Sequence, residues 1–478
     1  MPLILPSNSI SAVGYEVDNS LRFDDGFSDR LIKTFSTSGN QRTVTFSTWF
    51  KISALGTIRH LFSNSGADSI NLASNDTLEI QLGGSAEGYL YLNRVFRDPS
   101  AWYHIVFNMD TTQSTASNRL KVYINGIQET SFSATSYPTQ NLQTGFSENV
   151  QHSIGSRSAN NDRFFDGYMT ETVFIDGQQL DPTSFGEFDE DTGIWKPIDV
   201  SGLTFGTNGF YLDFESSGTL GNDVSGNGNN FTVNNLTSID QTTDTPTNNY
   251  ATLNPLVTAT VFTDNQTYSE GNTIFIPNST DQIGTTFSTI GVQGSGKWYW
   301  EAQVVWNGTS NNANFPKTIG FCTENYAFNY SYLGQDQESW GMMFSDDSPD
   351  QWFASHPDEN NNEGGTMANG DIVNLALDLD NGYFYFGVNG TYLNSGDPTS
   401  GASGTGAVFT LTATDLSKFI IPAITNSSVT TTYYKLNFGN PAFTISSGNS
   451  DGNGYGNFEY APPSGYYALN TKNLAEYG

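Results

Sequence analysis

The chain has 478 residues, of which 36% are hydrophobic and 14% aromatic. It is long enough for two domains and too rich in aromatic side chains for a disordered protein. Its 18 Lys and Arg against 49 Asp and Glu give a formal net charge of −31, which repels phosphate backbones and excludes nucleic acid as a partner.

Cys322 is the only cysteine, so an intrachain disulfide and a cysteine-based zinc site are both excluded. The first six residues (MPLILP) lack the basic start and the apolar length of a signal peptide. No apolar run approaches the ~18 residues that a membrane span needs. We therefore expect neither a signal peptide nor membrane insertion.

Short runs that alternate polar and bulky residues predict strands through the first half. The clearest run is 43–52, and Asn125-Gly126 after the run 119–124 is the strongest short hairpin signal. We expect strands at 21–23, 43–52, 78–82, 89–92, 102–107, 119–124, 128–132, 164–175 and 209–214.

A junction is predicted over 216–254. Four glycines fall between 218 and 228, and a polar Thr/Asn run follows over 241–249. Such stretches are typical of linkers between domains.

Strand signals resume in the second half at 273–276, 297–306, 318–322, 339–344, 372–378, 383–386, 419–423 and 433–438. We therefore expect an all-β protein with two tandem antiparallel β-sandwich, jelly-roll-like domains. The predicted parts are an N-terminal arm 1–14, a sandwich 15–215, the junction 216–254, a sandwich 255–445 and a C-terminal arm 446–478.

Motifs of the first half occur in the order 20–23 (SLRF), 46–51 (FSTWFK), 102–106 (WYHIV), 120–126 (LKVYING) and 165–176 (FDGYMTETVFID). In this order they resemble concanavalin A-like lectin/glucanase domains of the laminin-G and pentraxin type, over about 15–215. Trp49 and Trp102 are predicted to fill the core.

Motifs of the second half occur in the order 296–301 (GKWYWE), 319–321 (IGF), 340–341 (WG), 369–382 (NGDIVNLALDLDNG) and 384–390 (FYFGVNG). They resemble a SPRY domain over about 255–440. Both folds are binding scaffolds, and a fold alone does not determine a function.

The whole layout resembles structural proteins of marine tailed bacteriophages. The segments that carry this resemblance are 210–214 (FYLDF), 244–249 (DTPTNN) and 460–474 (YAPPSGYYALNTKNL). It implies a virion surface location for a protein made in the host cytoplasm and released by lysis.

No catalytic residue is predicted. The segment 187–192 (EFDEDT) lacks the third acid of the E-x-D-x-x-E pattern of laminarinases and lies in a turn-rich context. His104 lies within an aromatic strand and is expected to be a core histidine. No zinc-protease, phosphate-loop or G-x-S-x-G motif occurs.

Calcium is the cofactor that the sequence suggests. Asp223, Asn227 and Asn229 place hard oxygen donors on a glycine-rich turn, which suits Ca²⁺. The resemblance also implies calcium, because laminin-G and pentraxin relatives bind it at a sandwich rim. The alternative is an ordinary Asx turn with no metal.

Sugar binding needs aromatic faces with planar polar groups nearby. Tyr326, Tyr330 and Tyr332 crowd one loop-like stretch, and Trp352 lies in another. These four are the predicted glycan-binding residues, with burial in the core as the alternative.

The sequence thus predicts a non-enzymatic adhesin on a phage tail or head that contacts host-surface polysaccharide and other virion proteins, as a homo-oligomer. The alternatives are a capsid decoration protein with a structural role and, more distantly, a glycan depolymerase.

Overall fold

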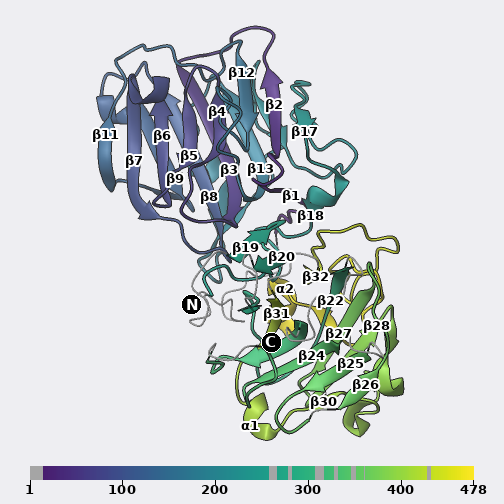
Figure 1. Cartoon of the computed structure of the whole chain (residues 1–478). Coiled ribbons are helices and arrows are strands. Elements are labelled where there is room, and N and C mark those ends of the chain that lie inside the picture. The colour runs from purple at the N-terminus through teal and green to yellow at the C-terminus, as the bar shows by residue number, and fades with distance from the viewer. Residues whose placement is uncertain are drawn as a thin grey trace. The chain divides into compact units, whose positions relative to one another are not determined.

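The computed structural model describes residues 14–257, 266–277, 283–306, 317–327, 332–345, 351–359, 361–427 and 432–478. The chain divides into two compact units, one running to Asn248 and the other beginning at Asn249 (Figure 1). Both units are built from β-sheets, which confirms the all-β prediction. None of the described helices has the length and apolar character needed to cross a bilayer.

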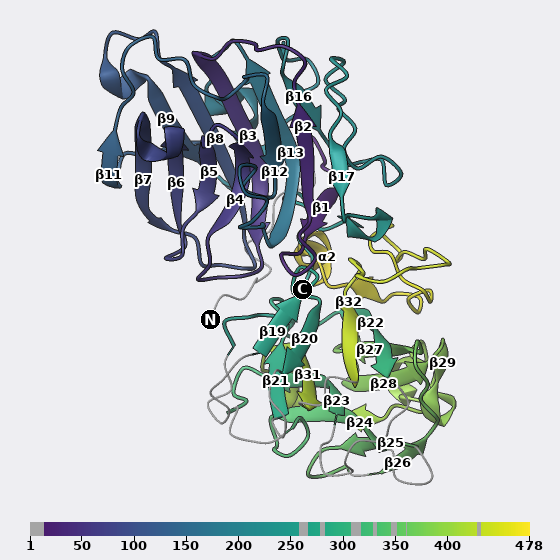
Figure 2. The same ribbon diagram turned by 45° about the horizontal axis from the view of Figure 1, so that its top comes forward.

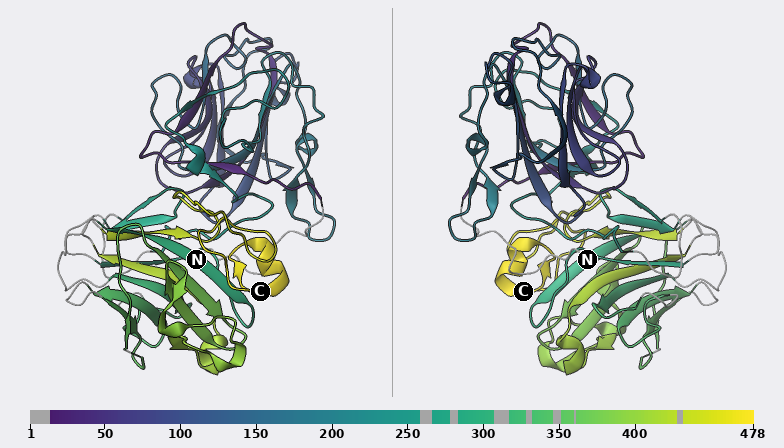
Figure 3. Two further views of the ribbon diagram at one scale, coloured as in Figure 1. Left: turned by 90° about the vertical axis from the view of Figure 1, so that its right-hand side faces the viewer. Right: turned by 90° about the vertical axis from the view of Figure 1, so that its left-hand side faces the viewer.

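The first unit is a sandwich of two sheets (Figure 3). One sheet has the order β10-β9-β8-β3-β13-β1-β18, with β16 beside β13. Its strands are β1 (Ser20–Phe23), β3 (Thr43–Ile52), β8 (Trp102–Asp110), β9 (Leu120–Ile124), β10 (Ile127–Gln128), β13 (Gly167–Asp176), β16 (Phe210–Leu212) and β18 (Gln241–Thr242).

The other sheet has the order β11-β7-β6-β5-β4-β12-β2-β17, and Figure 2 shows β17 beside β2 at its edge. Its strands are β2 (Arg30–Thr34), β4 (Arg59–Asn64), β5 (Ser69–Leu72), β6 (Thr77–Leu82), β7 (Gly88–Val95), β11 (Phe132–Ser136), β12 (Gln151–Ile154) and β17 (Thr232–Asn234). A separate hairpin joins β14 (Gly186–Phe188) to β15 (Trp195–Pro197).

Alternation along the strands creates the core of this unit. Ile70, Ile80 and Leu90 lie opposite one another on β5, β6 and β7 and are fully buried. Because successive side chains of a strand point to opposite faces, their neighbours in sequence lie on the outer face of the sheet.

The second unit also pairs two sheets. One has the order β19-β20-β32-β22-β27-β28-β29, with β30 beside β28 and β33 beside β22. Its strands are β19 (Gln266–Ser269), β20 (Ile274–Pro277), β22 (Lys297–Trp306), β27 (Ile372–Asp378), β28 (Tyr383–Val388), β29 (Thr391–Tyr392), β30 (Phe409–Thr410), β32 (Thr432–Asn437) and β33 (Tyr467–Ala468).

The facing sheet has the order β21-β31-β23-β24-β25-β26. Its strands are β21 (Ile283–Phe287), β23 (Lys317–Thr323), β24 (Ser339–Ser345), β25 (Gln351–Ser355), β26 (Asn362–Gly364) and β31 (Ile420–Ser427). Two short helices, α1 (Ala413–Leu416) and α2 (Thr471–Tyr477), complete the unit. Single 3-10 turns of the first unit are η2 (Gly83–Ser85), η3 (Ala116–Asn118), η4 (Pro182–Ser184) and η5 (Ser238–Asp240). Those of the second unit are η6 (Leu393–Ser395) and η7 (Gly401–Ser403).

Most of the segment predicted as a junction is an integral part of the first sandwich. Strand β17 pairs with β2, and β18 pairs with β1. Lys51 Nζ lies 2.8 Å from Asp244 Oδ2, and both side chains are buried. Trp102 Nε1 donates to Asp244 Oδ1 at 3.1 Å. The polar run that looked like a linker therefore supplies a buried carboxylate to the core.

The segment predicted as a C-terminal arm also packs onto its unit. Strand β33 pairs in parallel with β22. The buried carboxylate of Glu301 in β22 accepts hydrogen bonds from the backbone N–H groups of Glu459 and Tyr460, at 2.9 and 2.8 Å. The tail thus covers the outer face of this sheet.

Candidate functional site

Two tyrosines of β7 lie side by side on the outer face of the first unit. The ring centroids of Tyr89 and Tyr91 are 4.7 Å apart, with 26° between the ring planes. Both side chains are half-buried, whereas Leu90 between them is in the core. The pair therefore presents aromatic surface to solvent.

Planar polar groups lie directly opposite these rings. Glu79 pairs with Tyr91, and Gln81 pairs with Tyr89, across β6 and β7. Gln81 Nε2 donates to Glu79 Oε2 at 3.0 Å and to Tyr91 Oη at 3.4 Å. Ser85 Oγ lies 2.7 Å from Tyr91 Oη. We call these five residues the outer-face site.

Strand β5 orients the carboxylate of this site. Asn71 lies opposite Glu79 and donates from Nδ2 to Glu79 Oε2 at 3.4 Å. Ser69 Oγ in turn donates to Asn71 Oδ1 at 3.0 Å. Among the described residues Glu79 Oε1 accepts no hydrogen bond, and the side chain is half-buried. One carboxylate oxygen is therefore held by amides while the other can accept from a ligand hydroxyl.

Asp68 holds the turns beside the site. Its Oδ1 accepts from Gly83 N at 2.7 Å, and its Oδ2 accepts from Phe146 N at 3.0 Å and from Asn64 Nδ2 at 3.1 Å. Burial raises the pKa of Asp68 to about 6. Because Gly83 begins the turn that carries Ser85, this carboxylate positions one edge of the outer-face site.

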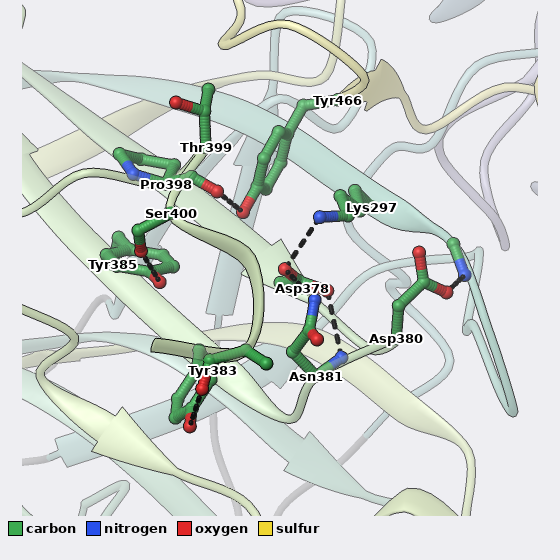
Figure 4. Close-up of polar contacts among 12 residues, drawn as sticks. Lys297, Asp378, Asp380, Asn381, Tyr383, Tyr385, Pro398, Thr399, Ser400 and Tyr466 are labelled. Atoms are coloured by element: carbon green, nitrogen blue, oxygen red, sulfur yellow. Dashed lines mark hydrogen bonds and ion pairs between the residues drawn. The ribbon is translucent and has the colours of Figure 1, made fainter. Parts of the chain in front are cut away.

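A second polar cluster lies on the other unit, around Lys297 (Figure 4). Lys297 Nζ lies 2.8 Å from the buried Asp378 Oδ2 and 5.6 Å from the ring centroid of Tyr466. Asn381 donates to Asp378 from its backbone N at 3.0 Å and from Nδ2 at 2.8 Å. Each oxygen of Asp378 is therefore already hydrogen-bonded within the protein.

The tyrosines of this second cluster fasten the loop 397–404 (Figure 4). Tyr466 Oη donates to Pro398 O at 2.9 Å, and Tyr383 Oη donates to Ala402 O at 3.2 Å. The Tyr385 hydroxyl lies 3.3 Å from Ser400 Oγ. Their polar atoms are occupied by the chain itself, so the outer-face site is the stronger candidate for a ligand.

The glycan-binding residues predicted from sequence are not gathered by the structure. Trp352 is fully buried, with its ring centroid 4.7 Å from that of Phe386, so this prediction is corrected: the indole has no face open to a sugar. Tyr326 is buried with 4% of its surface exposed, and Tyr332 is half-buried. Tyr330 lies outside the described residues.

His104 is a core histidine, as the sequence predicted. Trp195 Nε1 donates to His104 Nδ1 at 2.9 Å, so the neutral ring carries its proton on Nε2, which lies 2.8 Å from Ser47 Oγ. Burial lowers the pKa of His104 to about 3. The ring therefore donates to Ser47 and is not arranged as its general base.

The acidic segment 187–192 forms the end of the β14–β15 hairpin. Asp189 Oδ1 accepts from the backbone N and the hydroxyl of Thr192, both at 2.9 Å. These bonds, together with Lys196, lower the pKa of Asp189 to about 2. The carboxylate closes a turn, and this segment does not form an acid pair on one strand.

The predicted calcium ligands build a turn. Asp223 Oδ1 accepts from the backbone N of Tyr211 and of Ser225, both at 2.9 Å, and Oδ2 accepts from Asn229 N at 2.7 Å. The side-chain amides of Asn227 and Asn229 donate to backbone carbonyls of the segment 206–209. In the part of the chain that the structure describes, no group of three or more His, Cys, Asp or Glu side chains is placed to hold a metal ion.

We expect a calcium chelator to leave the melting temperature of the protein unchanged, because both oxygens of Asp223 are engaged by backbone N–H groups. Asp223→Ala should lower the free energy of unfolding by about 1–3 kcal/mol, since buried donors lose their acceptor. Asp191→Ala, at an exposed carboxylate, is the control and should change it by less than about 0.5 kcal/mol. A melting temperature that falls with chelator and recovers with Ca²⁺ would instead assign a cation to the turn.

The sequence did contain a signal for the outer-face site. The run 89–92 (YLYL) alternates aromatic and aliphatic residues, which places both tyrosines on one face of a strand. The partners on β5 and β6 come from the sheet register, which a single strand does not reveal.

Comparison with known families confirms the two resemblances in their predicted order. Residues 27–179 match the family described as the concanavalin A-like lectin/glucanases superfamily, and residues 297–424 match the SPRY domain. No curated protein matches the chain.

Several solved structures are similar to parts of the chain. The SPRY domain of human HERC1 is 16% identical, with 34% of this chain and 86% of that chain covered and a TM-score of 0.26. A putative carbohydrate binding protein from Bacteroides ovatus is 14% identical, with 46% and 59% covered and a TM-score of 0.34. Domains LG4-5 of the mouse laminin alpha1 chain are 9% identical, with 90% of each chain covered and a TM-score of 0.28.

Proposed function

We propose that this protein binds glycans without cleaving them, through the outer-face site of its first unit. The observation that carries the proposal is the pair of half-exposed rings of Tyr89 and Tyr91 beside the carboxylate of Glu79 and the amide of Gln81. Sugar rings stack on aromatic faces, and their hydroxyls bond to planar polar groups.

The family matches support this reading at a coarser level. Residues 27–179 match a lectin-like family, and both matched families are β-sandwich binding scaffolds. The site also has a low entropic cost of binding, because hydrogen bonds already hold Gln81 and Glu79 in place.

We further propose that the protein is displayed on a bacteriophage particle and contacts polysaccharide of the host surface. The resemblance of 244–249 and 460–474 to structural proteins of tailed phages supports this location. A single outer-face site is small, so adhesion would depend on many copies acting together.

Tyr91→Ala should weaken glycan binding about tenfold to a hundredfold, because the ring supplies both stacking surface and a hydroxyl partner for Gln81. The measurement is binding of the purified chain and its variant to an array of bacterial surface oligosaccharides. The wild-type protein should also block infection when added before the phage.

Phe188→Ala is the matched control, since Phe188 is an exposed aromatic residue of the β14–β15 hairpin, 48% exposed and outside the outer-face site. It should bind as the wild type does. Equal losses in both variants would remove the assignment of binding to the outer-face site. No binding of any oligosaccharide by the wild type would remove glycan binding and favour a structural role on the particle.

A further inference from the structure

The segment 155–163, which follows β12, lies over the outer face of β4, and β5 separates β4 from the strands of the outer-face site. Ser63 Oγ of β4 donates to Ser156 O and accepts from Ser158 N, each at 2.8 Å. Arg157 Nε donates to Asp162 Oδ1 at 2.6 Å, and its second nitrogen reaches Asp162 Oδ2. This bidentate pair closes the segment into a compact loop.

His60 lies beneath this loop with no hydrogen-bond partner for either ring nitrogen. It is only 2% exposed and lies directly opposite Asn71 in the sheet. Asn71 in turn bonds to Glu79 of the outer-face site. A buried imidazole without protein partners is costly, and a water, an ion or a ligand atom is the usual partner of such a group.

Arg163 is the second unusual residue of the loop. Its backbone O accepts from His60 N at 3.1 Å, and its φ is 54°, a conformation that a residue other than glycine or asparagine rarely adopts. Its side chain is exposed, and among the described residues its guanidinium makes no ion pair. Strain of this kind persists where a function depends on the position of the side chain.

The loop carries a net positive charge, whereas the whole chain is strongly negative. Arg157 and Arg163 carry two positive charges against one negative charge on Asp162, a balance of 2 − 1 = +1 in a chain of net charge −31. Burial and, to a smaller extent, the positive charges of Arg163 and Arg157 lower the pKa of His60 to about 3. His60 is thus neutral and offers one donor and one acceptor.

We propose that Arg163, whose backbone is held by His60, forms an acidic-sugar subsite, which binds the carboxylate of a sugar in the same glycan that stacks on Tyr91. This inference rests on the proposed function. The row His60, Asn71, Glu79 and Tyr91 crosses four neighbouring strands, so the two ends are roughly 14 Å apart. That span fits an oligosaccharide, and the planar fork of arginine fits a carboxylate.

The test is an array of oligosaccharides in matched pairs, each backbone present with its carboxylates intact and with them reduced to alcohols. The full chain should bind the carboxylated member about tenfold more tightly. Arg163→Asn removes the charge while keeping a residue that tolerates positive φ, and it should bring the ratio between the two members to about one. Arg163→Lys should give an intermediate ratio, because lysine keeps the charge but lacks the fork.

Arg42→Ala is the matched control, because it removes an exposed arginine directly before β3, in the other sheet of the unit. It changes the net charge equally and should keep the wild-type ratio. Equal binding of both members by the wild type would overturn the acidic-sugar subsite and leave glycan binding standing. A ratio that falls as far in Arg42→Ala as in Arg163→Asn would also overturn it. No binding to any pair would overturn both proposals.

Discussion

Lys51→Met should lower the free energy of unfolding of the first unit by about 3–5 kcal/mol, because it leaves the buried carboxylate of Asp244 without its cation. Trp102 Nε1 still donates to that carboxylate, but a neutral donor does not compensate a buried charge. The measurement is chemical unfolding followed by fluorescence of the tryptophans.

The double variant Lys51→Met with Asp244→Asn separates charge from packing. It removes both charges and keeps an oxygen for Trp102, so it should be more stable than Lys51→Met alone. Arg94→Met, which breaks the exposed pair with Glu129, is the control and should cost less than about 1 kcal/mol. Additive losses in the double variant would show that the ion pair is not the origin of the effect.

The second large effect is a pH dependence of the free energy of unfolding, which arises from Glu301. Its carboxylate is fully buried beneath the tail, and burial raises its pKa from the ordinary 4.5 to about 7. The folded state therefore holds the proton more tightly than the unfolded state does. As pH rises from about 5 to 8, this group alone should lower the free energy of unfolding by about 3 kcal/mol.

Glu301→Gln cannot titrate and should flatten this part of the stability profile. Unfolding by urea at a series of pH values from 5 to 8.5 measures the slope for both proteins. Glu476→Gln, at an exposed carboxylate of α2, should keep the wild-type slope. The assignment fails if Glu301→Gln loses stability with rising pH as steeply as the wild type does.

Strong alternation of side chains made part of the fold predictable. The ranges 43–52, 297–306 and 372–378 have the same bounds as β3, β22 and β27. The short strands β2 (RLIKT) and β5 (SINL) were not predicted. Strand β5 has four residues, too few to show a clear alternation, and β2 pairs with the distant strands β12 and β17. A local pattern cannot reveal such pairing.

The candidate site was harder to predict for the same reason. Two of the aromatic residues predicted to bind glycan, Tyr326 and Trp352, proved to be buried, whereas the pair on β7 gains its polar partners through sheet register. Asp244 was read as part of a polar linker because its burial depends on Lys51, 193 positions earlier in the chain.

The pairing of β1 with β18 and of β2 with β17 has a consequence for biosynthesis. Strands β1 and β2 leave the ribosome well before partners that lie more than 200 positions later in the chain, Thr242 for Ser20 and Asn234 for Arg30. At ordinary translation rates this delay lasts roughly ten to fifty seconds. During it, the edges of both nascent sheets remain open to pairing with other chains, so the early strands depend on slow, non-local closure or on protection by chaperones.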